Sequence, residues 1–179
     1  IYNAPCISAL VMANLAKAVQ SSIPVQAAKK MSVDTNRPDI CNVELIVDQS
    51  IYFGELTIMA YILNQANTSR LQNQKYWCQG NSNLSFDSLV YKLNARLRPA
   101  SNAFAITAKN SEPAKDLIKL VAKELEESGV FTSLCEDENC LRVAAASLVF
   151  SCLDPVQKLI NKKAQTALKA LKTKYGFIG

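Results

Sequence analysis

The chain has 179 residues, of which 49% are hydrophobic, and its formal net charge is +5; this length fits one folded domain with a substantial core. No run of eighteen apolar residues is present, so we expect a soluble protein without a membrane span. The chain has no histidine and only five glycines, which removes the usual general base, the commonest zinc ligand and any glycine-rich phosphate loop, so no catalytic, cofactor-binding or metal site is predicted.

The first part of the chain is predicted to form two helices and a strand. Apolar residues over positions 7–19 recur at helical spacing, and a shorter helix is expected over residues 24–31. Residues 41–47 then alternate between apolar and polar side chains, which is typical of a half-buried strand.

Two further helices are predicted in the middle of the chain. Residues 50–53 are β-prone, but the apolar spacing over residues 55–65 indicates a turn near Gly54 followed by a helix. Ser85 is expected to N-cap the next helix. The apolar face of that helix consists of Phe86, Leu89, Val90, Leu93 and Leu97.

Residues 103–152 are predicted to form a strand–helix–strand–strand unit. The apolar run 103–108 indicates a strand. Apolar residues then recur in steps of three and four up to Leu125, which predicts a helix with Ser111 as its N-cap and Gly129 just past its end.

The last part of this unit is predicted to be a β-hairpin. Two β-prone runs, 130–135 and 140–150, lie on either side of the four polar residues 136–139, which is a hairpin loop length. Cys135 and Cys140 then face each other across the loop and are a candidate disulfide. Two reduced thiols are the alternative, because the sequence does not fix the redox compartment.

Together these elements predict an α+β fold in a single domain over residues 1–179. Its small mixed sheet is expected to contain residues 41–47, residues 103–108 and the hairpin 130–150. Helices at the N-terminus and a long basic helix over residues 154–176 flank this sheet. The last helix is also a candidate interaction arm.

Positive charge is concentrated in this predicted C-terminal helix, called the basic helix below. Its six lysines are Lys158, Lys162, Lys163, Lys169, Lys172 and Lys174. Negative charge gathers in an acidic corner made of Glu124, Glu126, Glu127, Glu136, Asp137 and Glu138. The lysines fit three interpretations: a solvated helix face, a contact with nucleic-acid phosphates, or assembly in which the basic helix of one molecule meets the acidic corner of another.

The sequence therefore favours a non-enzymatic interaction or assembly subunit whose partner is another protein or a second copy of the chain. The alternative is a nucleic-acid-binding protein in which the basic helix contacts phosphates. Membrane contact is not expected, because the basic helix has no Trp or Phe anchor before Phe177. The chain begins with Ile1 rather than Met, which indicates a processed N-terminus or a fragment.

Overall fold

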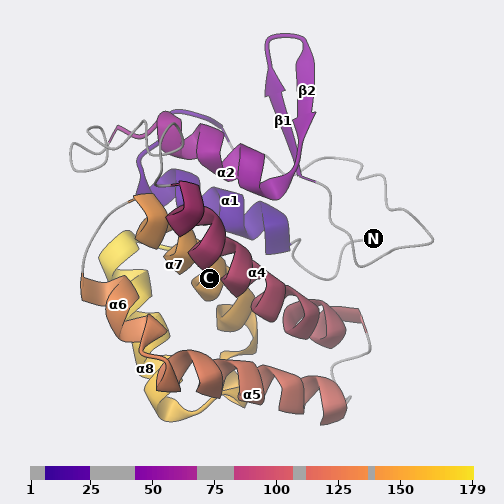
Figure 1. Cartoon of the computed structure of the whole chain (residues 1–179), viewed down its shortest axis with the longest axis vertical. Helices are drawn as coiled ribbons and strands as arrows, with labels where there is room; N and C mark the ends of the chain where they lie inside the picture. Colours follow the sequence, from indigo (N-terminus) through magenta and orange to yellow (C-terminus); the bar gives the residue numbers. More distant parts are fainter. Residues whose placement is uncertain (1–6, 25–42, 68–82, 107–111, 137–139) are drawn as a thin grey trace.

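The computed structural model is built mainly from helices, with one small β-sheet (Figure 1). It describes residues 7–24, 43–67, 83–106, 112–136 and 140–179. In chain order the elements are α1 (Ile7–Ala18), β1 (Glu44–Val47), β2 (Ser50–Phe53), α2 (Glu55–Asn64), α4 (Asn83–Ile106), α5 (Glu112–Glu127), α6 (Val130–Glu136), α7 (Cys140–Leu153), the 3-10 helix η2 (Asp154–Leu159) and α8 (Lys162–Tyr175). Helices combined with a small antiparallel sheet confirm the predicted α+β class.

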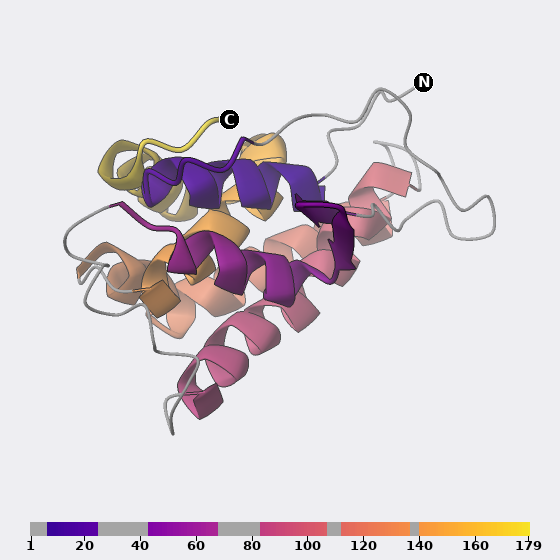
Figure 2. The ribbon, with the colours of Figure 1, turned by 90° about the horizontal axis from the view of Figure 1, so that it is seen from above.

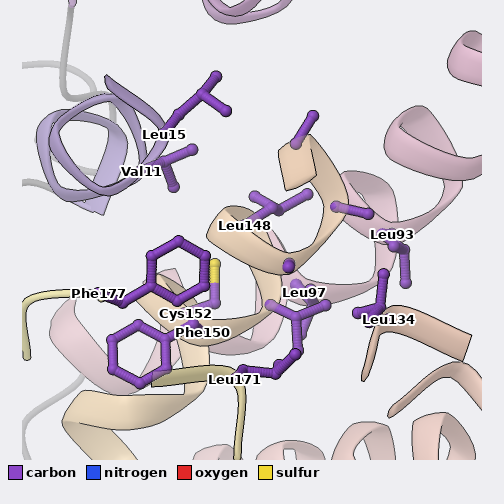
Figure 3. Close-up of a cluster of buried hydrophobic side chains, with 14 of the residues drawn as sticks. Val11, Leu15, Leu93, Leu97, Leu134, Leu148, Phe150, Cys152, Leu171 and Phe177 are labelled. Carbon is purple, nitrogen blue, oxygen red and sulfur yellow. The ribbon is translucent and has the colours of Figure 1, made fainter. Parts of the chain in front are cut away.

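Helix α7 lies at the centre of the fold. Helices α1, α4, α6 and α8 all pack against it, and every residue from Val143 to Leu153 is buried, with no charged residue among them. Ala144, Ala145 and Ala146 are small, so neighbouring helices can approach closely on several sides. Figure 3 shows the side chains that surround α7 in this core, which include Val11, Leu15, Leu93, Leu97, Leu134, Leu171 and Phe177.

The surrounding helices each bury one face, and most of them were predicted from their apolar spacing. α1, α2 and α5 occupy the predicted ranges to within a few residues, and α1 and α2 lie side by side in Figures 1 and 2. Helix α5 buries Ala114, Ile118, Val121, Ala122 and Leu125. Its predicted cap Ser111 lies outside the described residues, as do residues 25–31 of the predicted second helix.

The segments predicted as strands after residue 100 are helical, so the strand–helix–strand–strand unit is wrong. Residues 103–106 continue α4, and residues 107–108 lie outside the described residues. The runs 130–135 and 140–150 belong to α6 and α7. An apolar run without polar interruptions fits a buried strand and a buried helix equally well, and α7 is buried on all sides, so its sequence carries no period that distinguishes them.

The small sheet is a hairpin that stands out from the helical body (Figure 1). Within the described residues it has two antiparallel strands, so the predicted strand 41–47 is confirmed over β1, while the predicted mixed sheet is not formed. Asp48 and Gln49 form the turn, and Asp48 has a φ of 56°, which Asp tolerates better than most residues. Gly54, with a φ of 103°, then turns the chain into α2 as predicted.

The predicted basic helix 154–176 is interrupted rather than continuous. After η2 the chain is extended at Ile160 and Asn161, and α8 begins at Lys162. The side chain of Asn161 caps α8 by accepting a hydrogen bond from the Ala164 N–H at 2.8 Å. Gly176, in the left-handed conformation with a φ of 69°, ends α8 as predicted.

The segment after α8 folds back over the core and is fixed there by Asn14 of α1. The buried Asn14 amide donates to Ser151 Oγ at 3.0 Å and to the Ile178 carbonyl at 3.1 Å. Its Oδ1 atom accepts a hydrogen bond from the Ile178 N–H at 2.6 Å. The Phe177 ring packs on the ring of Phe150 in α7, with 5.1 Å between their centroids. Phe177 is therefore part of the core, and Asn14 ties the exposed Ile178 to it.

Replacing Asn14 with alanine should destabilise the protein by about 1–3 kcal/mol, because it leaves the Ser151 hydroxyl and the Ile178 peptide groups without their buried partner. Urea denaturation measures this loss. The matched control is Asn64→Ala at an exposed position in the last turn of α2. If the two variants lose the same stability, Asn14 does not hold the C-terminal segment.

Candidate interaction surface

The outer face of the hairpin carries two exposed apolar side chains, Ile46 and Ile51, which we call the hairpin patch. Their exposed fractions are 66% and 53%. Tyr52 is 48% exposed, but it pairs with Leu45 and so lies on the other face of the ribbon. Ile46 and Ile51 are directly opposite each other across the ladder, so their side chains lie on one face of the ribbon. Exposed single apolar residues are ordinary, but a cross-strand pair on a projecting element is a candidate contact surface.

The opposite face of the hairpin is held by the helical body. Leu45 is buried and Val47 is half-buried, and both pack against the main core. Side chains alternate between the two faces of a strand, so fixing Leu45 and Val47 inward directs Ile46 outward. The exposure of the hairpin patch is thus a consequence of the register that the core imposes.

A charged cluster at the base of the hairpin fixes the start of α2. The Arg98 guanidinium of α4 pairs with Glu55, the first residue of α2. It also donates to Ser8 Oγ of α1 at 3.0 Å and to Asn94 Oδ1 at 3.1 Å. The Arg98 and Glu55 side chains are only 14% and 20% exposed, so the pair is partly desolvated and its hydrogen bonds are directional. This cluster joins three helices directly beside Gly54.

The basic helix is docked on the fold, with its lysines on the outside. Helix α8 buries Ala164, Leu168, Leu171 and Tyr175, and the Tyr175 hydroxyl donates to the Leu134 carbonyl at 2.9 Å. Lys174 Nζ donates to the Cys135 carbonyl at the end of α6, at 2.6 Å. This cation at a helix C-terminus is favourable.

The remaining lysines divide into engaged and solvated groups. Lys163 Nζ lies 2.9 Å from Glu126 Oε1. Lys172 acts on Asp154. Burial raises the pKa of Asp154 above its ordinary value, and the positive charge of Lys172 partly opposes that rise. Lys158, Lys162 and Lys169 are exposed and make no ion pair within the described part of the chain. A contact of these lysines with a partner stays a prediction.

The acidic corner meets the basic helix within one molecule. Glu126 pairs with Lys163 and accepts a hydrogen bond from Asn161 at 2.7 Å. Glu124 pairs with Arg96 of α4, and Glu127 lies 3.6 Å from Lys123. Asp137 and Glu138 lie outside the described residues. Much of the charge that an intermolecular contact would use is therefore already neutralised inside the molecule.

The pKa of Glu126 is lowered from its ordinary value of 4.5, chiefly by the Lys163 ammonium and then by the Asn161 amide. A lowered pKa means that the folded state favours the carboxylate. The stabilisation that the Glu126 carboxylate provides is therefore present above the pKa of this group in the unfolded chain. It is lost as the pH falls through the lower pKa of the folded state.

Glu126→Gln should accordingly lower the urea midpoint at pH 7, and the difference from the unsubstituted protein should shrink as the pH falls below about 4.5. Glu127→Gln, in the same turn of α5 and more exposed, is the control. A Glu126→Gln deficit that is equally large at pH 7 and pH 3 would show that the carboxylate charge is not responsible.

The two candidate disulfide residues do not face each other across strands. Cys135 is half-buried on α6 and Cys140 is buried at the start of α7. The hairpin geometry from which the bond was predicted is therefore wrong. Burial raises the pKa of the Cys135 thiol, which keeps it protonated and weakly nucleophilic near neutral pH.

Within the described residues, no group of three or more Cys, Asp or Glu side chains is placed to hold a metal ion. One helical stretch, Cys140–Leu159, is long and apolar enough to cross a membrane, but 72% of its most apolar window is buried inside the fold. That burial is what the central helix of a compact core requires.

No protein-family model matches the chain, and no curated protein or solved structure matches it either. The function has to be inferred from the surface of this molecule. Sequence reasoning recognised residues 50–53 as β-prone but did not pair them with residues 44–47. The signal for this pairing was the two-residue separation by Asp48 and Gln49, which is a hairpin length.

Proposed function

We propose that this protein is a non-enzymatic interaction subunit that contacts another polypeptide through its hairpin. The observation that supports this most is the cross-strand pair Ile46 and Ile51, exposed on an element that projects from the helical body (Figure 1). Aromatic residues are enriched in protein interfaces, and Tyr52, half-exposed on the other face of β2, adds one to the hairpin.

The charge asymmetry gives weaker support to the same function. An exposed ion pair contributes little to affinity, and Glu126 and Lys163 already satisfy each other inside the molecule. We infer that the acidic corner and the basic helix mainly position α5 and α8. Lys158, Lys162 and Lys169 remain available to steer a partner of opposite charge toward the molecule.

Nucleic-acid binding is the second candidate, and those three solvated lysines favour it. Each lysine that neutralises a phosphate adds to a salt-dependent affinity. On α8 the lysines are spread around the exposed face, and the basic helix supplies neither an arginine for bidentate contacts nor an exposed aromatic ring for stacking on a base. The hairpin patch therefore has more support as the functional surface.

A photoreactive amino acid tests the proposed function. Benzoylphenylalanine in place of Ile51 should form adducts with a defined protein when the full chain is irradiated in an extract of its natural source. The matched control carries the same group in place of Tyr91, an exposed tyrosine on α4. We expect several-fold more adduct from position 51.

Absence of any adduct from position 51 would overturn the proposal. Equal yields from positions 51 and 91 would do the same, because they would indicate random collision rather than a specific contact surface. The mass of the adduct distinguishes a second copy of this 19.6 kDa chain from a different protein.

A further inference from the structure

One edge of strand β2 pairs with no other strand among the described residues. Within the described residues the sheet contains two strands, so β2 is paired on one side only. Its residues Ser50–Phe53 include no charged residue and no proline, and its pairing with β1 contains no β-bulge. Natural proteins usually protect such an edge with lysine, proline or a bulge, because an open edge recruits another strand.

The register identifies which backbone groups face outward. Val47 and Ser50 close the two-residue turn, and in such a turn the closing pair exchanges hydrogen bonds. Hydrogen-bonded and non-hydrogen-bonded pairs alternate along an antiparallel ladder, so Ile46 and Ile51 form a non-hydrogen-bonded pair. The N–H and C=O groups of Ile51 therefore point away from β1, toward the open edge.

We propose that a second copy of this chain pairs its β2 with β2 in an antiparallel manner, centred on Ile51. A two-fold axis perpendicular to the sheet keeps each residue on its own face and places Ile51 opposite Ile51 of the second copy. Their outward N–H and C=O groups exchange two hydrogen bonds. The four strands then carry one continuous row of isoleucine side chains, made of Ile46 and Ile51 from each copy.

The other edge of the hairpin does not support the same pairing. Two β1 strands centred on Ile46, whose backbone groups also point outward, would place Glu44 of each copy opposite Asp48 of the other. Both facing pairs would be acidic, and like charges directly opposite each other are destabilising. Strand β2 has no charge to oppose its own copy, so the self-complementary edge is β2.

This inference depends on the proposed function, since it names the partner of the same hairpin. A four-residue edge buries much less than the roughly 1,200 Å² of a stable interface. The pairing should therefore be weak and dependent on concentration. A covalent trap is consequently a better readout than an elution volume.

The test is oxidative cross-linking of purified full-length Ile51→Cys. The two Cα atoms at position 51 should lie about 5.5 Å apart, within the range that a disulfide accepts. Ile46→Cys is the matched control. This position is exposed on the same face, but in the proposed pairing it lies about 14 Å from position 46 of the second copy, across three strand spacings. We expect a covalent dimer of Ile51→Cys, rising with protein concentration and about tenfold above Ile46→Cys, with the unsubstituted chain as background.

Equal dimer yields from the two variants, or no dimer from Ile51→Cys, would overturn the pairing. Circular dichroism confirms that both variants are folded, which is expected because both positions are exposed. A photo-adduct at position 51 with a different protein, together with no Ile51→Cys dimer, would refute pairing with a second copy but leave the interaction function standing. Failure of both experiments would remove the interaction function as well.

Discussion

The burial of α7 on every side is the constraint on which the rest of the fold depends. Eleven consecutive residues, Val143–Leu153, are buried and carry no charge, so other elements must cover each face of the helix. Its two buried serines are satisfied locally, because Ser147 Oγ donates to the Ala144 carbonyl at 2.8 Å and Ser151 Oγ accepts from Asn14. Helices α1, α4, α6 and α8 supply the cover, and the chain after α8 completes it.

This arrangement decides which surfaces are left for function. Helix α8 must contribute Leu168 and Leu171 to the core, so the basic helix is a structural element with lysines on its outside. Several of its charges then serve the fold, as the contacts of Lys163 and Lys174 illustrate. The core fixes the hairpin on one face, through Leu45, and leaves Ile46 and Ile51 exposed on the other face.

Helices that bury one face were predicted from the sequence, whereas a helix that is buried on all sides was assigned as a strand. α5 was found because Ile118, Val121 and Leu125 recur at helical spacing, and the corresponding pattern located α1, α2 and the first part of α4. In α7 no polar face interrupts the apolar residues, so the sequence has no period that distinguishes a helix from a strand. The choice then depended on length and residue propensity, and β-prone residues such as Val149 and Phe150 indicated a strand. The hairpin patch was not predicted, because residues 50–53 were not paired with residues 44–47, and only that pairing places Ile51 opposite Ile46.

Native-state hydrogen exchange tests the central position of α7 most directly. If the core is built around this helix, the amides of α7 exchange only when the whole molecule unfolds, and their exchange free energies equal the global free energy of unfolding. Amides of β1 and β2 open more easily and exchange faster, since the hairpin projects from the body and has one buried face. Exchange of the α7 amides at the rate of the hairpin amides would contradict a fold organised around α7.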